Sequence, residues 1–170
     1  MAETDSILEL SVEALTASAF AAYGEVLENK SVERRRDFAM PFGQIDTGSQ
    51  PRLWVNRLPG CRAASLKIDS MECHPRAPQT FIPMHPMPCL IVVALPGEGG
   101  QPSQSTLRAF VSKGGQGVCY RPSVWHYTFT SLGGPNEVVV ILANSGHEND
   151  TIVAQLKRPA RVNLKLRRTR

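Results

Sequence analysis

A carboxylate, an imidazole and an amide stand close together in the segment MECHPRAPQ, residues 71–79. Glu72 and His74 are two positions apart, so on an extended strand their side chains point to the same face. Gln79 follows at the start of the apolar run TFIPM. A carboxylate and an imidazole on one face can act as acid and base, or they can bind a divalent metal ion together.

A second histidine follows a turn in the segment GVCYRPSVWH, residues 117–126. The pattern indicates a strand, a tight turn at Pro122-Ser123, and then His126 at the start of another strand. If both segments lie in one barrel, four polar side chains converge inside its mouth: Glu72, His74, Gln79 and His126. These groups suit a divalent transition metal (Ni, Zn, Mn or Fe), and they could equally bind an organic substrate directly.

The remaining histidines and the nearby aromatic residues have simpler interpretations. His85 lies beside Pro86 and His147 lies in a loop, so both are expected to be hydrogen-bonded structural residues. Tyr120 and Trp125 are expected to pack in the core or to line the pocket wall.

The elements that must position these residues are short apolar runs separated by turns such as PGEGG, KGGQG and LGGPN. A short helix is expected within residues 15–28, ending at Gly24. Strands are expected at residues 7–12, 52–57, 64–70, 79–84, 89–95, 106–111, 117–120, 126–131 and 137–142. This series favours an all-β antiparallel barrel or sandwich over alternating βαβ units.

The composition is that of a water-soluble globular protein. Of 170 residues, 42% are hydrophobic and 20% are charged, enough for one domain with a real core. No apolar run approaches the roughly 20 residues that span a bilayer, and the acidic start MAETDSILEL is unlike a secretory signal. We therefore expect a cytoplasmic protein with no membrane partner. The four cysteines have no CxxC spacing, which favours free, buried thiols.

The net charge of +4 comes from the end of the chain, where residues 156–170 hold seven basic residues and no acidic one. We expect a barrel domain over residues 1–155 and a flexible basic tail over residues 156–170. No aromatic residues stand among the basic residues of this tail, so a solvated terminus is favoured over a nucleic-acid contact.

The two polar segments resemble the two signature motifs of the cupin superfamily. In the first motif, Glu72 stands at the first histidine position, His74 at the second, and Gln79 at the glutamate position. In the second motif, Ser123 replaces a glycine and His126 keeps its place. The resemblance implies a jelly-roll barrel of the double-stranded β-helix type.

The chain also resembles the ureidoglycolate lyase family, from about residue 8 to about residue 145. The similar stretches are AFAAYGEVLE, WVNRLP, ECHPRAPQTFIPM and LRAFVSKGGQGVCYRPSVWHYTF. The resemblance implies a homodimer that splits the carboxylate (S)-ureidoglycolate into glyoxylate and urea, late in allantoin and purine breakdown.

The resemblance also suggests roles for individual residues. Glu72, His74 and His126 are candidates for acid and base, with or without a metal, and Arg121 joins them as a possible catalytic residue. Arg57, Arg108 and Arg121 are candidates for a clamp on the substrate carboxylate, because a guanidinium binds a carboxylate with two hydrogen bonds; Arg108 could equally be a surface residue. The predicted substrate-binding set is Gln79, Arg57, Arg108, Tyr120, Trp125 and Tyr127.

Several positions depart from the family pattern and keep other functions open. Arg121 and Tyr127 stand where members have histidine, Cys119 replaces an asparagine, and Leu142-Ala143 replaces Asp-Arg. One alternative is a divergent enzyme that performs an elimination, dehydration, isomerisation or cyclisation on a larger or more apolar metabolite. Another is a non-catalytic, ligand-binding cupin.

Overall fold

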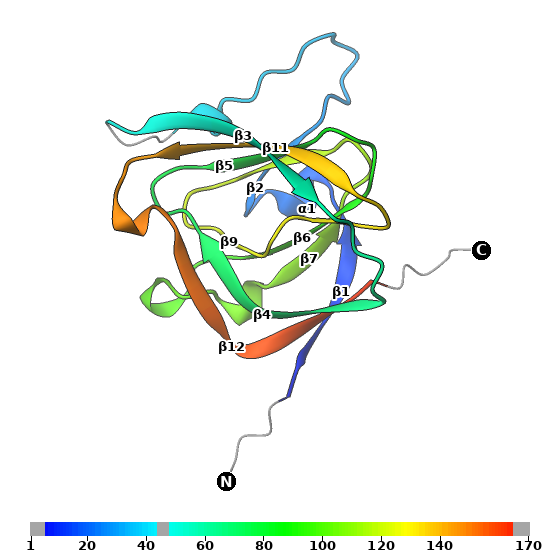
Figure 1. Cartoon of the computed structure of the whole chain (residues 1–170), viewed down its shortest axis with the longest axis vertical. Helices are drawn as coiled ribbons and strands as arrows, with labels where there is room; N and C mark the ends of the chain where they lie inside the picture. Colours follow the sequence, from blue (N-terminus) through cyan, green and yellow to red (C-terminus); the bar gives the residue numbers. More distant parts are fainter. Residues whose placement is uncertain (1–5, 44–47, 165–170) are drawn as a thin grey trace, which may run out of the picture.

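A computed structural model describes residues 6–43 and 48–164, and strands dominate it (Figure 1). The strands are β1 (Leu8–Ala14), β2 (Gly24–Leu27), β3 (Gln50–Leu58), β4 (Ser65–Cys73), β5 (Gln79–Pro83), β6 (Cys89–Ala94), β7 (Arg108–Val111), β8 (Gly117–Tyr120), β9 (Trp125–His126), β10 (Thr130–Ser131), β11 (Asn136–Asn144) and β12 (Ile152–Asn163). The helix α1 covers Ala17–Phe20, and short 3-10 turns cover Met40–Phe42, Glu98–Gly100, Gln104–Thr106 and Glu148–Asp150. No helix in these ranges is long and apolar enough to cross a bilayer.

The strands form two sheets that lie against each other. One sheet has the order β10-β6-β7-β1-β12-β4-β9, and an additional pairing between β6 and β9 closes it into a ring. The other has the order β2-β8-β5-β11-β3 and forms the upper layer in Figure 1. Most pairings are antiparallel, while β1 pairs in parallel with both β12 and β7. The predicted all-β barrel is confirmed.

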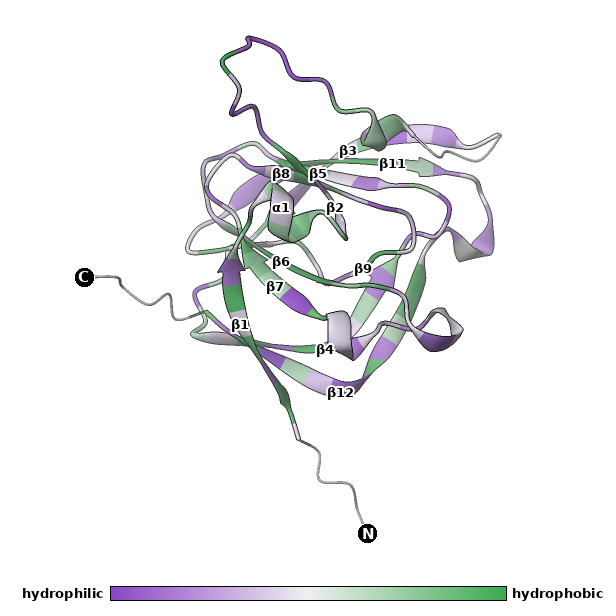
Figure 2. Ribbon diagram, turned by 180° about the vertical axis from the view of Figure 1, so that it is seen from behind, coloured by the Kyte–Doolittle hydropathy of each residue, from purple (hydrophilic) through white to green (hydrophobic). Residues whose placement is uncertain are grey.

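The strand β6 lies between two hydrophobic clusters, which explains its unbroken apolar sequence CLIVVA. Cys89, Ile91 and Val93 face the cluster between the two sheets. The alternate residues of β6 face a second cluster within the ring. Because both faces of β6 are buried, hydrophobic residues are needed at every position, and Figure 2 shows this strand coloured hydrophobic in the interior.

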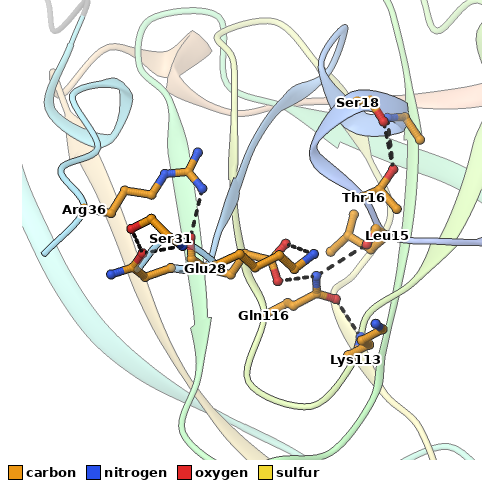
Figure 3. A network of polar contacts seen from close by, with 11 residues as sticks. Leu15, Thr16, Ser18, Glu28, Ser31, Arg36, Lys113 and Gln116 are labelled. Atoms are coloured by element: carbon orange, nitrogen blue, oxygen red, sulfur yellow. Dashed lines mark hydrogen bonds and ion pairs between the residues drawn. The ribbon is translucent and has the colours of Figure 1, made fainter. Parts of the chain in front are cut away.

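A buried glutamine ties three loops together beside the barrel. Gln116 lies in the turn between β7 and β8 and is 3% exposed. Its Oε1 accepts the Lys113 N–H at 2.7 Å, and its Nε2 donates to the Glu28 carboxylate at 2.9 Å and to the Leu15 carbonyl at 3.4 Å (Figure 3). The Glu28 carbonyl in turn accepts a hydrogen bond from Arg36 at 3.1 Å. The turn is therefore held by side-chain contacts to the segments after β1 and β2.

The predicted helix is shorter in the structure, because α1 ends at Phe20 and Gly24 begins the strand β2. Thr16 caps the helix by accepting the Ala19 N–H at 3.2 Å. Gly24 pairs with Tyr120 of β8, and a Cβ at Gly24 would lie 1.9 Å from the carbonyl oxygen of Cys119. A glycine is therefore required here by the close approach of two strands rather than by the end of a helix.

The end of the chain also differs from the prediction, because β12 continues to Asn163 through the expected tail. This strand pairs with both β4 and β1. Leu156, Ala160 and Val162 point into the core, and basic residues between them point outward, as Arg161 does toward Glu9. The rest of the predicted tail, residues 165–170, lies outside the described residues.

Candidate active site

The two polar segments meet where the strands β4 and β9 pair. Glu72 lies opposite His126 in this pairing, and His74 follows β4 directly in the turn toward β5. One ligand atom from each of the three side chains lies within 4.8 Å of the other two. The imidazole rings of His74 and His126 have centroids 5.4 Å apart. The predicted convergence of these three residues is therefore present in the structure.

Hydrogen bonds to the backbone orient both imidazoles in the same way. The Nδ1 atom of His126 lies 3.0 Å from the Val124 carbonyl, and the Nδ1 atom of His74 lies 3.0 Å from the Asp150 carbonyl. A carbonyl can only accept, so each Nδ1 carries a proton and each Nε2 is the ring nitrogen left for a ligand. Both Nε2 atoms are buried without a hydrogen-bond partner among the described residues. Both Nε2 atoms are thus available to a group bound between the two rings.

Charge at this site is carried by Glu72, whose side chain is 41% exposed. Its Oε1 atom lies 3.4 Å from the Nε2 atom of His126, and the contact with His126 lowers the pKa of Glu72 below its usual value. Burial lowers the pKa of His74. At neutral pH the site therefore holds an ionised carboxylate beside a neutral His74.

The segment of residues 117–126 supports both histidines, through its turn at Ser123 and through the ring of Tyr120. Ser123 has a φ of 65°, in the left-handed region that favours glycine, and its N–H donates to the His74 carbonyl at 2.9 Å. The ring of Tyr120 stacks on His126 with 4.5 Å between centroids and 17° between planes. The position of His126 is thus fixed from both ends of the segment.

A pocket of about 100 Å³ extends from Glu72 between the two layers. Its lining residues are Asn56, Leu58, Glu72, Gln79, Phe81, Thr128, Phe129 and Val138. Gln79 is 5% exposed, and its Oε1 atom has no hydrogen-bond partner among the described residues. The pocket combines a polar end with an apolar wall, where Phe81 and Phe129 stack at 5.0 Å.

The three arginines predicted to clamp a carboxylate lie away from this pocket. Arg57 is on the opposite face of β3 from Asn56 and lies 3.7 Å from Glu137. Arg108 forms a two-pronged ion pair with Glu13 on the surface. Arg121 donates to the Ala21 carbonyl at 3.0 Å. Each guanidinium has a partner outside the pocket, and none of the three arginines is among the residues that line it.

The predicted aromatic residues also lie outside the pocket lining. Trp125 packs in the second hydrophobic cluster and donates its indole N–H to the Gly100 carbonyl at 2.9 Å. Tyr127, directly after β9, packs against the same cluster. Tyr120 supports His126 from within the core. In place of Tyr127, the following Thr128 and Phe129 reach the pocket.

Several pocket residues were not predicted from the sequence. Asn56 and Leu58 come from β3 and Val138 comes from β11, the two strands at one end of the five-stranded sheet. Alternation places Asn56 and Leu58 on one face of β3, yet the sequence does not say which face meets the pocket. Asp150 was also missed, because it acts on His74 through a backbone carbonyl.

The family model and the curated relatives agree on one family. The family model described as ureidoglycolate lyase matches residues 7–163. A ureidoglycolate lyase of Brucella ovis is 36% identical over 143 residues, which cover 78% of this chain and 81% of that protein. A ureidoglycolate lyase of Burkholderia mallei is 34% identical over 142 residues, with the same coverage. Among solved structures, a dTDP sugar isomerase from Desulfovibrio desulfuricans G20 is similar with a TM-score of 0.47 and 15% identity, covering 77% of this chain and 81% of that chain.

Proposed function

This chain belongs to the ureidoglycolate lyase family, and from this premise we propose that it cleaves ureidoglycolate to glyoxylate and urea. It is therefore a lyase. The proposal depends on the convergence of Glu72, His74 and His126, with Glu72 at the end of a pocket that has polar and apolar walls. It includes the homodimer and the cytoplasmic location that the family resemblance implies.

The reaction needs one proton to move from oxygen to nitrogen. The bond between the hydroxyl-bearing carbon and the ureido nitrogen breaks, the hydroxyl becomes a carbonyl, and the nitrogen leaves as urea. Glu72 is ionised at neutral pH, so its carboxylate can take the hydroxyl proton. Because its pKa is lowered, the protonated carboxyl then gives that proton readily to the departing nitrogen. One residue in contact with both atoms can therefore complete the transfer.

The same residues fit a divalent transition metal ion. Two imidazole lone pairs and one carboxylate, all within 4.8 Å of one another, form a common open-sided ligand set. Glu72, His74 and His126 would hold the ion, and the Gln79 amide oxygen is a weaker candidate ligand beside them. When bound, the ion would supply a positive charge that stabilises negative charge developing on the substrate oxygen. The Nδ1 hydrogen bonds of both histidines are the kind of support that metal-binding imidazoles use.

The rest of the pocket binds and encloses the substrate. The Asn56 amide and the Thr128 hydroxyl can hydrogen-bond the ureido group, which has both donors and acceptors. The stacked rings of Phe81 and Phe129 exclude water from the opposite side.

The test is to incubate the purified protein with ureidoglycolate and to measure glyoxylate above the spontaneous rate. The measurement is made after treatment with a chelator and again after adding Ni²⁺, Zn²⁺, Mn²⁺ or Fe²⁺. We expect glyoxylate release by the wild type and loss of at least about 100-fold in kcat/KM for His126→Ala. His85→Ala is the matched control, because His85 lies near Glu137 outside the pocket. No release above the spontaneous rate under any metal condition would overturn the proposal.

A further inference from the structure

The strand β3 is a long edge strand that no other described strand pairs with on its outer side. It ends the five-stranded sheet, and of its nine residues only Leu58 is even partly buried. Apolar side chains are exposed in its middle: Leu53 is 67% exposed, Val55 49% and Trp54 37%. Pro51, Arg52 and Arg57 flank this apolar middle, and an exposed apolar stretch on a nine-residue edge strand is a surface for strand pairing.

The two faces of β3 have different neighbours. Asn56 and Leu58 line the pocket, so the even-numbered positions, Arg52 and Trp54 included, lie on the pocket face. The Trp54 indole N–H donates to the Asn56 amide oxygen at 3.1 Å, which agrees with this assignment. Leu53 and Val55 lie on the outer face.

The pocket lacks a positive charge among the residues that the structure describes around it. Its one charged lining residue is Glu72, and the other lining residues are neutral. Ureidoglycolate carries a carboxylate, which would lie near that of Glu72 without a partner. A buried carboxylate of this kind is normally bound by an arginine. The pocket lining of one chain therefore offers no cationic side chain to the substrate carboxylate.

We propose that a second copy of this chain pairs antiparallel with β3, edge to edge, and that Arg52 of the partner subunit binds the substrate carboxylate. This inference rests on the proposed function. The pairing that uses the whole strand joins Gln50 to Leu58 of the partner subunit and has Trp54 at the two-fold axis. Arg52 of the partner subunit then lies opposite Asn56, and directly opposed residues share a face with about 5 Å between Cβ atoms. The guanidinium therefore reaches the pocket wall.

A copy of the chain fits this edge for reasons of symmetry and charge. A strand that pairs antiparallel with its own copy makes a two-fold, self-complementary contact. In the same register Leu53 lies opposite Val55 of the partner subunit, so exposed apolar side chains cover each other on the outer face. Neither Arg52 nor Arg57 lies opposite another arginine, so like charges do not oppose the contact.

The first experiment measures the contact itself and needs no activity. Light scattering is expected to give a mass of twice the 18.6 kDa chain for the wild type and a monomer for Val55→Lys. Val153→Lys is the matched control, because Val153 is 65% exposed on β12, and this variant should remain a dimer. The double variant Arg52→Cys, Asn56→Cys should form an intermolecular disulfide on oxidation, whereas Arg52→Cys alone should not. A monomeric wild type, a dimeric Val55→Lys or an uncrosslinked double variant would overturn the proposal.

The second experiment asks which subunit supplies the arginine. Arg52→Ala and His126→Ala should each lower kcat/KM about 100-fold when assayed alone. After subunit exchange, the mixed dimer has one site with an intact His126 and an Arg52 from the other subunit. Random exchange should therefore restore about a quarter of the wild-type sites. If no activity returns, Arg52 does not act across the dimer and the proposal fails. If instead the wild type does not cleave ureidoglycolate, the proposed function fails, while mass and crosslinking still decide the interface.

Discussion

At the scale of single residues, a substitution at Tyr120 tests whether this residue supports His126 or takes part in the chemistry. Its ring stacks on His126, while its hydroxyl is buried without a partner among the described residues. If the ring alone matters, Tyr120→Phe should keep kcat/KM within about threefold of wild type and change stability by about 1 kcal/mol or less. Glyoxylate release and thermal unfolding measure both quantities. A loss of about 100-fold with an unchanged melting temperature would show that the hydroxyl contacts the substrate, as its place in the predicted binding set requires.

The protonation of His74 sets the expected pH dependence. Burial lowers the pKa of His74, so its Nε2 lone pair stays free until the pH falls below the ordinary histidine value of 6.5. The pKa of Glu72 is also lowered, so its carboxylate remains ionised over the same range. We expect kcat/KM to be flat between about pH 7 and 8 and to fall on the acid side, with a midpoint below about 6.5. A midpoint above this value in the pH–rate profile would contradict the neutral His74, and His85→Ala should give the wild-type profile.

The convergence of Glu72, His74 and His126 was predicted from local spacing and from the motif resemblance. Glu72 and His74 share a face because they are two apart, and the motif resemblance adds His126. The arginines could not be placed in this way, because the face that Arg57 occupies depends on the pairing of β3 with β11. That register is set by residues far away in the sequence.

At the scale of elements, the two missed strands have different physical causes. The strand β2 lies in an alanine-rich stretch with local helical spacing, and its pairing with β8, about ninety residues later, decides its conformation. In β12 the alternation of Leu156, Ala160 and Val162 with basic residues is interrupted by the irregular pairing between Gln155 and Ala160. An irregular strand of this kind has no clean two-residue period in its sequence. Most other strands were predicted because apolar and polar residues alternate regularly in them and glycine-rich turns mark their ends.

The turn between β7 and β8 gives a prediction at this scale. Gln116→Ala removes the acceptor for Lys113 N–H and the donor to Glu28 and Leu15. Because the freed groups are partly buried, we expect a loss of about 1–3 kcal/mol in the free energy of unfolding, measured by urea titration. The matched control is Gln101→Ala, at an exposed position, which should change this energy by less than about 0.5 kcal/mol. Equal stability of the two variants would show that the network does not hold the turn.

At the scale of the whole molecule, the candidate site lies at the seam where the barrel closes. The strand β9 has two residues, yet it pairs with β4 on one side and with β6 on the other. His126 belongs to this strand, Glu72 to β4, and His74 to the turn that leaves β4. The groups that would hold a metal ion therefore come from both sides of the closing pair. Binding at the site and closure of the ring are expected to be coupled.

This coupling predicts that a divalent metal ion stabilises the whole fold. An ion that binds only the folded chain and is present at about 100 times its Kd should add about 2.7 kcal/mol to the free energy of unfolding. For a chain of this length, that corresponds to a rise of roughly 5–10 °C in Tm. Thermal unfolding of chelator-treated protein, with and without added Ni²⁺, Zn²⁺, Mn²⁺ or Fe²⁺, measures the shift. The shift should persist in His85→Ala and disappear in His126→Ala, since His126 is one of the three groups that would hold the ion and His85 lies outside the site. An equal shift in both variants would mean that the ion binds elsewhere. No shift with any of these ions would mean that Glu72, His74 and His126 act on the substrate directly.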